Sequence, residues 1–505
     1  MQTLKKLKEE SLLDYSFRLS NIYKENQQKD VRKGKGQFFT APNIAKFMAS
    51  LANIEKQEIR ILDPGAGTGI LTAAIFDLII NNSKNPMKIY LDVYETDKSI
   101  ISLLNSFLLE SKRELSNHNH YLSFNIYDKD FVITNSYYIE GTLKNGLFNN
   151  KRLYDIVISN PPYFKLSKNS PEAISLISLV NGQPNIYAFF MAISAAMLNN
   201  EGQMIFITPR SFCSGLYYSK FRKWFVNHVM LSNIHLFSSR KNVFSNEDVL
   251  QENIIIKGIK NNGEINPNNL VKITTSEDDT FIDLESIEVP YSKIIYKRNG
   301  DLYIFIPTSE LDLEIFESLN KFPHIMKHLN FGVSTGPVVP FRTKENLIYS
   351  LKENTENIVP LLWMHNFVNF ELTWPVFKNG NAISIKKNED TRGLLIKKGN
   401  YVILKRFGSK EQKRRLQAAV LLEEDFKDFS CIGLENRLNY IHKKNGNLTK
   451  EEALGIATIL NLNITDLFFR MLNGHTQINA NELNALPLPA LNKIIEIGRI
   501  TNENN

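Results

Sequence analysis

The stretch Ile59-Arg-Ile-Leu-Asp63-Pro-Gly-Ala-Gly-Thr-Gly69 decides the fold class. A strand is expected over 59–62 and a helix from about Ile70, with three glycines between them. Glycines let a backbone approach a ligand closely, and a helix N-terminus points unpaired N–H groups at it. The spacing G-x-G-x-G fits neither the dinucleotide pattern G-x-G-x-x-G nor a P-loop. We therefore expect Asp63, Gly65, Gly67 and Gly69 to form a nucleoside site that takes neither a nicotinamide cofactor nor a nucleoside triphosphate.

Apolar strands and amphipathic helices alternate on both sides of this loop. The expected strands are 59–62, 89–94, 153–159, 203–209, 234–237 and 253–260, and the expected helices are 44–53, 71–80, 98–115, 186–198 and 217–228. Alternating strands and helices of this length are typical of a parallel, doubly wound α/β sheet. The second half of the chain has shorter apolar runs and more turns, so a mixed α/β domain is expected there.

An acidic residue follows the second strand of this pattern. The segment Leu91-Asp-Val-Tyr-Glu95 ends in a carboxylate, 26 residues after Gly69. In a doubly wound fold this is where ribose hydroxyls are held, because a carboxylate accepts two of their hydrogen bonds. Asp97 is a nearby alternative, and a carboxylate that merely solvates a strand end is the plain structural interpretation.

The segment Asp155-Ile-Val-Ile-Ser-Asn160-Pro-Pro-Tyr163 indicates the chemistry. Proline cannot continue a central strand, so the chain stops at the carboxyl end of the sheet, where open α/β sheets bind ligands. The amide oxygen of Asn160 and the carbonyl of Pro161 then offer two acceptors to one amino group, and Tyr163 offers a ring face. Two acceptors on the N–H hydrogens favour a tetrahedral, nucleophilic nitrogen on a conjugated base.

Residues 34–260 resemble the γ-class, TaqI-like DNA amino methyltransferases, which use S-adenosylmethionine (AdoMet). The segment Gly36-Gln-Phe-Phe-Thr40-Ala-Pro42 is similar to the family's first motif. The resemblance implies that Thr40, Asn160 and the glycine loop contact AdoMet, and that Asp130 and Phe131 bind its adenine, with Asp128 as a competing choice. It also implies that Tyr163 and Phe244 stack on the two faces of a flipped-out target base.

The same resemblance implies N6-adenine methylation without a metal. N4-cytosine methyltransferases more often have serine at the position of Asn160, so adenine is favoured. The alternatives left open are N4-cytosine methylation, a protein glutamine or ribosomal RNA methyltransferase, and a non-catalytic DNA-specificity subunit. A base inside a duplex cannot reach such a site, so the target has to leave the stack.

The second half carries the positive charge of the chain. Residues 386–415 hold 11 Lys and Arg against 3 Asp and Glu, whereas the whole chain has a net charge of +7. Lys405, Arg406, Arg414 and Arg415, interleaved with aromatic residues, are expected to contact the phosphates of double-stranded DNA. Segments near 331–337 and 473–489 resemble target-recognition domains, and with the chain length they resemble the PstI/BsuBI group of modification methylases, whose target is CTGCAG. No nuclease pattern is visible, so a cognate restriction endonuclease would be a separate polypeptide.

Length and composition agree with this organisation. The 505 residues and 58.1 kDa suggest two or three domains, and 43% hydrophobic residues can build substantial cores. We expect a helical extension over 1–30, a catalytic domain over 31–265, a linker within 261–300 and a recognition domain over 300–505. The two cysteines form no metal or disulfide pattern, and no long apolar run is present, so a cytoplasmic protein without a membrane segment is expected.

Overall fold

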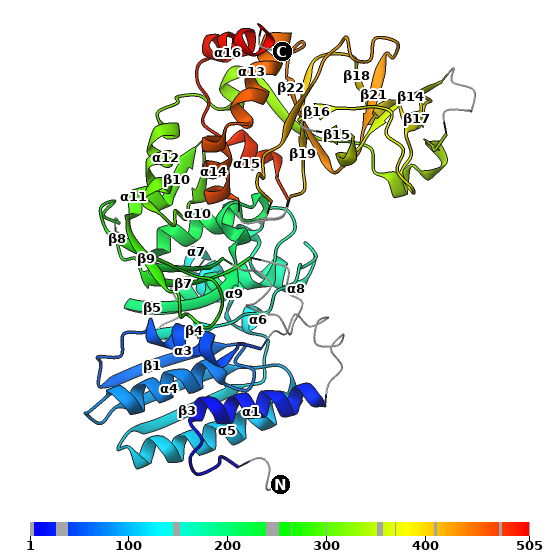
Figure 1. Cartoon of the computed structure of the whole chain (residues 1–505). Coiled ribbons are helices and arrows are strands. Elements are labelled where there is room, and N and C mark those ends of the chain that lie inside the picture. The colour runs from blue at the N-terminus through cyan, green and yellow to red at the C-terminus, as the bar shows by residue number, and fades with distance from the viewer. Residues whose placement is uncertain are drawn as a thin grey trace. The chain divides into compact units, whose positions relative to one another are not determined.

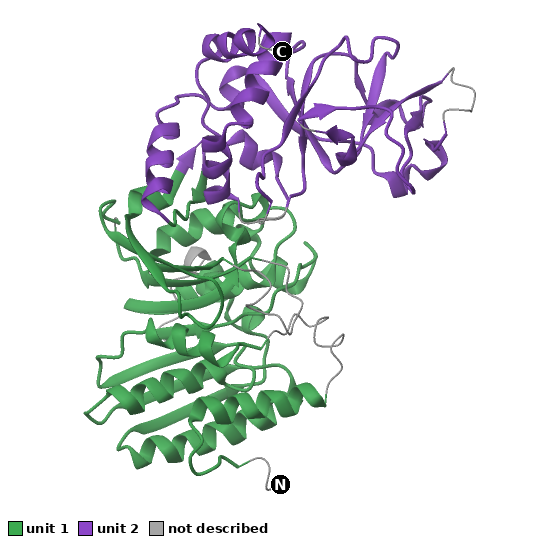
Figure 2. Ribbon diagram, viewed as in Figure 1, with its two compact units in different colours: residues 1–296, 302–308 green, residues 297–301, 309–505 purple. Residues whose placement is uncertain are grey.

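The computed structural model describes residues 5–26, 39–144, 152–238, 252–263, 265–298, 300–350, 357–368, 370–408, 412–473 and 477–503. Two compact units divide the chain (Figure 2). Unit 1 contains residues 1–296 and 302–308, and unit 2 contains residues 297–301 and 309–505.

The described part of unit 1 is built on a nine-stranded sheet with the order β3-β2-β1-β4-β5-β7-β6-β8-β9 (Figure 1). The strands are β1 (Glu58–Pro64), β2 (Lys88–Tyr94), β3 (Tyr121–Tyr127), β4 (Tyr154–Ser159), β5 (Leu198–Pro209), β6 (Val229–Phe237), β7 (Asn253–Lys260), β8 (Leu270–Ser276) and β9 (Glu285–Pro290). This confirms the predicted α/β class. The sheet is mixed rather than fully parallel, because β7 runs antiparallel to both β5 and β6, and β9 runs antiparallel to β8.

Helices cover this sheet in two groups. One group is α1 (Leu12–Glu25), α3 (Pro42–Ser50), α4 (Ile70–Asn82) and α5 (Lys98–Asn117), which pack on one another, and the other is α6 (Phe131–Asn135), α7 (Tyr137–Lys144), α9 (Ile186–Ala196) and α10 (Ser219–His228). Helix α4 is apolar on nearly all sides because the sheet and three helices surround it. The chain reverses its winding between β1 and β4, and this switch point is where such sheets bind ligands.

The expected N-terminal extension is part of the core of unit 1. Leu12, Leu13 and Leu19 of α1 are buried in the same cluster as α4. The backbone N–H groups of Leu12 and Leu13 donate to the carboxylate of Asp77 at 3.1 and 3.0 Å. The apolar stripe of α1 is narrow among many charged residues, which is why the sequence favoured a polar extension.

The expected linker also differs from the structure. Its middle contains β8 and β9, which extend the sheet beyond β6. In β8 the side chains of Val271 and Ile273 are buried, whereas those of Leu270 and Lys272, which alternate with them, are exposed. A strand of alternating burial needs few apolar residues, so the polar composition of 261–300 concealed it.

The described part of unit 2 contains two main sheets, consistent with the predicted mixed α/β class. A four-stranded sheet has the order β12-β22-β19-β20 and a five-stranded sheet has the order β13-β17-β14-β21-β18. Their strands are β12 (Phe331–Thr335), β22 (Leu438–Lys443), β19 (Tyr401–Lys405), β20 (Ala418–Leu421), β13 (Leu347–Ile348), β17 (Ser384–Lys386), β14 (Ile358–Leu362), β21 (Cys431–Leu434) and β18 (Leu395–Lys397). A short hairpin and the helices α12 (Glu310–Asn320), α13 (Lys450–Leu460), α14 (Asn463–Leu472), α15 (Ala480–Asn484) and α16 (Leu491–Glu503) complete it.

Three properties of the described residues bear on the class of protein. No single helix is long and apolar enough to cross a membrane, although the bent pair α13 and α14 passes the test of length and composition together. Within the same residues, no group of three His, Cys, Asp or Glu side chains is arranged to hold a metal ion. Cys213 and Cys431 are both free and buried.

Candidate active site

The glycine loop turns tightly between β1 and α4. Gly65, Gly67 and Gly69 have φ angles of +76°, +57° and +85°, a region that favours glycine. The N–H groups of Gly65 and Ala66 donate to the carbonyl of Tyr94 at 2.9 and 3.0 Å. The loop is therefore fastened to the end of β2, and its backbone lines a cavity of about 460 Å³.

Glu95 joins the two strand ends. One carboxylate oxygen accepts the N–H groups of Thr96 and Asp97 at 2.8 and 2.9 Å, and the other accepts the N–H of Gly67 at 3.0 Å. Burial raises the pKa of this carboxyl group, although the three backbone donors act in the opposite direction. Glu95 lines the cavity and keeps acceptor capacity on the oxygen that binds Gly67, because a carboxylate oxygen accepts more than one hydrogen bond.

Asp97, the alternative to Glu95, also lines the cavity, but its side chain has a structural role. One of its oxygens caps α5 by accepting the N–H of Ser99 at 3.0 Å. The other accepts the hydroxyl of Tyr23 in α1 at 3.1 Å. Glu95 is therefore better suited than Asp97 to accept hydroxyl groups from a ligand.

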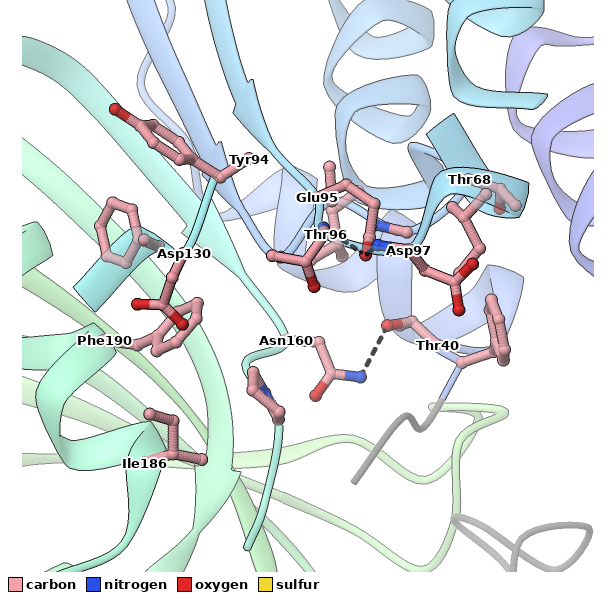
Figure 3. A pocket seen from close by; sticks show the side chains of 18 of the residues that line it. Thr40, Thr68, Tyr94, Glu95, Thr96, Asp97, Asp130, Asn160, Ile186 and Phe190 are labelled. Carbon is pink, nitrogen blue, oxygen red and sulfur yellow. Dashed lines mark hydrogen bonds between the residues drawn. The ribbon is translucent and has the colours of Figure 1, made fainter. Parts of the chain in front are cut away.

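Aromatic side chains surround the far end of the cavity (Figure 3). Phe131 lies edge-on to Tyr94 with a centroid distance of 5.1 Å, and 4.9 Å from Phe190. Asp130 caps α6 by accepting the N–H of Ile133 at 2.8 Å and lines the same cavity. Asp128, the competing choice, is exposed and is absent from the lining. An apolar slot beside the carboxylate of Asp130 suits a planar base that carries an amino group.

Asn160 lines the cavity, and its side chain points toward Thr40 (Figure 3). Its amide nitrogen donates to the hydroxyl of Thr40 at 3.0 Å. Its amide oxygen accepts the hydroxyl of Tyr163 at 2.5 Å, and that hydroxyl also lies 2.8 Å from the carbonyl of Ile207. The amide is held from both ends, so its orientation is fixed before a substrate arrives.

The rest of the tetrad is arranged differently from the expectation. Tyr163 is only 8% exposed and lies edge-on to Tyr187, and it does not line the cavity. Pro161 is buried, whereas Pro162 and the half-exposed Phe164 line the cavity. In this structure Tyr163 orients Asn160 through its hydroxyl, and its ring face is covered. Phe244 lies outside the described residues.

Asp63 is close to the glycine loop but is absent from the cavity lining. It is buried, and one carboxylate oxygen accepts the hydroxyl of Thr72 at 2.7 Å, whereas the other has no hydrogen-bond partner among the described residues. Burial raises the pKa of this carboxyl group to about 7. Asp63 therefore connects the end of β1 to Thr72 of α4, on either side of the glycine loop, and does not bind a ligand directly.

Asp63→Asn tests this raised pKa through stability. Because the folded pKa lies above the usual value, Asp63 contributes stability that is complete below pH 4 and is lost as the pH rises through about 7. We expect Asp63→Asn to be more stable than the wild type at pH 8, on the order of 2–4 kcal/mol at most, and we expect this difference to vanish below about pH 4. Thermal midpoints measured without ligand at both pH values check this, and an equal difference at both would contradict it.

Helix α1 contributes contacts that sequence reasoning missed. The hydroxyl of Ser16 donates to the carbonyl of Thr68 in the glycine loop at 2.9 Å, and the hydroxyl of Thr68 donates to the carbonyl of Ser16 at 3.2 Å. Tyr23 reaches Asp97, as described above. The sequence indicated these contacts only through small polar residues that interrupt the apolar stripe of α1. Glu172 and Lys129 also line the cavity and carried no signal in the sequence.

The basic residues predicted in unit 2 fall into two classes. Lys405, Arg406 and Arg414 are partly exposed. Arg415 is 2% exposed, and its backbone N–H donates to Asp466 at 2.8 Å. Its side chain is therefore buried in unit 2, and the prediction that it contacts phosphates is wrong for this structure.

Known proteins are similar in sequence to this chain along most of its length. The family model described as "Eco57I restriction-modification methylase" matches residues 16–244. The chain is 37% identical over 476 residues to the Type II methyltransferase M.BsuBI of Bacillus subtilis, which covers 93% of this chain and 90% of the relative. This chain belongs to the restriction-modification methylases. The methylase is also 33% identical to the Type II methyltransferase M.PstI of Providencia stuartii, over 92% of this chain and 89% of the relative.

These identities confirm the resemblance of the methylase to the PstI/BsuBI group. They extend across both units, so the second half of the methylase belongs to the same family as the first. A solved structure of a DrdV–DNA complex covers 97% of the methylase and 59% of that chain, with a TM-score of 0.50 and 13% sequence identity. At that identity the likeness concerns the fold alone.

Proposed function

We propose that this methylase transfers a methyl group from AdoMet to N6 of adenine within a specific sequence of double-stranded DNA. The observation that supports this most directly is one cavity lined by Glu95, Asp130 and Asn160, which are the acceptors that a nucleoside cofactor and a target amine require. The membership in the restriction-modification methylases points to protection of host DNA. A separate endonuclease would be its functional partner, and the PstI/BsuBI likeness favours CTGCAG as the target.

The residues of the cavity fit AdoMet. Glu95 has acceptor capacity for ribose hydroxyls, and Asp130 with the aromatic slot suits an adenine ring and its amino group. Gly65 and Gly67 line the cavity and have no side chain, so a cofactor could approach the backbone of the loop closely. Bound AdoMet supplies an electrophilic methyl group on a sulfonium.

Asn160 prepares the target amine. Its amide oxygen has two lone pairs, so it can accept an N–H of the target while Tyr163 remains close. Hydrogen bonds to the N–H hydrogens would favour a tetrahedral nitrogen, whose lone pair is then free to form a bond to the methyl carbon. The C–S bond of the sulfonium would break in the same step, and the neutral thioether would leave. After transfer, the nitrogen is cationic and loses a proton to water, so no strong general base is needed. The base must be outside the stack for this contact to form.

The decisive experiment uses tritiated AdoMet and unmethylated bacterial DNA, followed by digestion to nucleosides. We expect label in N6-methyladenine. Label in N4-methylcytosine would support the cytosine alternative, and label in protein or RNA alone would overturn the proposal. Sequencing of methylated bases in DNA from an expressing host then identifies the site and tests CTGCAG.

The two adjacent arginines of unit 2 provide a matched test of DNA binding. Arg414 is partly exposed, so Arg414→Ala is expected to weaken DNA binding and to lower the slope of log K against log salt by about 1. Arg415 is buried, so Arg415→Ala is expected to lower the thermal midpoint and to leave the slope unchanged. Equal slopes for the wild type and Arg414→Ala would show that Arg414 is solvated and does not contact DNA phosphates.

A further inference from the structure

The tip of a short hairpin in unit 2 combines features that fold stability does not explain. Strands β15 (Phe367–Val368) and β16 (Glu371–Leu372) pair antiparallel, with Phe367 opposite Leu372 and Val368 opposite Glu371. Phe370 lies in the two-residue connection and has φ +68°. This left-handed conformation is unfavourable for a bulky side chain, and such hairpin turns favour glycine at this position.

The apolar side chains of this tip face solvent. Phe370 is 45% exposed and Val368 is 48% exposed. The base of the hairpin is well supported, because Phe367 is buried in a core cluster and the buried Asn366 exchanges hydrogen bonds with Thr373 at 2.9 and 2.7 Å. A firmly supported hairpin therefore presents apolar side chains to water in a strained conformation. Strain of this kind is retained mainly where function requires it.

One cation lies at the tip of this hairpin and another at its base. The guanidinium of Arg414 lies 5.9 Å from the centroid of the Phe370 ring, and it also donates to the carbonyl of Asn461. The ammonium of Lys405 lies 5.3 Å from the ring of Phe367. An aromatic ring bordered by positive charges is complementary to a base step bordered by phosphates. Apolar wedges in DNA-binding proteins enter the stack between base pairs in this way.

From this geometry we infer that the β15–β16 tip is a wedge that inserts Phe370 into the base stack of duplex DNA, with Arg414 and Lys405 on the adjacent phosphates. The inference rests on the proposed action on DNA. According to this inference, unit 2 distorts the duplex, and this role is separate from the recognition of base edges. A residue that suits the left-handed conformation would relieve the strain at position 370, but the inserted ring would then be lost.

The test replaces Phe370 with residues that suit the left-handed conformation. Phe370→Asn and Phe370→Gly are expected to keep or raise the thermal midpoint and to leave AdoMet binding unchanged. Their affinity for duplex DNA is expected to fall about tenfold, as for loss of one stacked aromatic side chain. Phe377→Asn is the matched control, because Phe377 is another phenylalanine of the same unit and is 68% exposed.

Insertion is measured as unwinding of a closed circular plasmid that the wild-type protein methylates. After relaxation by a topoisomerase, the wild type and Phe377→Asn are expected to shift the linking number, and Phe370→Asn is not. Unchanged DNA affinity and unwinding in Phe370→Asn would overturn the inference, as would a lowered thermal midpoint in both replacements. Loss of self-association in sedimentation, with DNA affinity kept, would instead assign the tip to protein contacts. Absence of DNA methylation by the wild type would refute the proposed function rather than the wedge.

Discussion

Asn160→Ala is expected to lower the rate of methyl transfer at least 10²–10³-fold, the effect of removing one aligned polar group from a reacting centre. The affinity for AdoMet is expected to remain within a few-fold, because Glu95 and Asp130 hold the nucleoside part of the cavity. Single-turnover rates with labelled AdoMet and calorimetric titration of AdoMet measure the two quantities. Residual turnover combined with lost AdoMet affinity would contradict the assigned role.

Tyr163→Phe is the matched control for this substitution. It removes the hydroxyl that lies 2.5 Å from the Asn160 oxygen and keeps the buried ring. If Tyr163 acts by orienting the amide, the turnover number falls about tenfold while the Michaelis constant for DNA changes little. If its ring stacks on the target base instead, Tyr163→Phe leaves both constants close to those of the wild type.

Gly69→Ala is expected to destabilise unit 1 by about 3 kcal/mol. A Cβ at this position would lie 2.7 Å from the ring of Phe107, and the φ of +85° is unfavourable for alanine. The backbone contributes about 1–2 kcal/mol and the overpacking about 1–3 kcal/mol. Phe107 belongs to α5 and its ring is buried in the core, so the ring has little room to move.

Gly67→Ala separates these two contributions. Its φ is also positive, at +57°, but the nearest side-chain atom to a new Cβ is 3.9 Å away, on Phe39. We expect a loss of about 1 kcal/mol from the backbone alone. Thermal midpoints of both variants check the pair, and equal shifts would show that the contact with Phe107 is not the cause.

The sequence predicted the features that depend on neighbours in the chain. The glycine loop, the helix that follows it, and the strand that ends at Asn160 are all coded locally by glycine, apolar runs and proline. Strand β3 was missed although Tyr121–Tyr127 alternates, because its outward residues include aromatics that blur the pattern.

The missed parts of the site depend on contacts between distant residues. Thr40 and Asn160 are 120 positions apart, and their hydrogen bond follows only from the fold. The burial of Tyr163 and of Arg415 is likewise a property of packing, since an arginine in a basic run is usually solvated. The contacts of α1 with the glycine loop require the helix to be placed against α4, which the sequence alone did not indicate.

Those contacts of α1 determine where a catalytic fragment can begin. The first recognisable motif starts near residue 36, and a fragment begun there would lack Ser16 and Tyr23. The Thr68 carbonyl would lose its donor, the oxygen of Asp97 would lose the Tyr23 hydroxyl, and the apolar face of α4 would be open to water. The smallest unit that can form the cofactor cavity is therefore longer than the stretch that carries the methyltransferase motifs, and it includes the helix that precedes them.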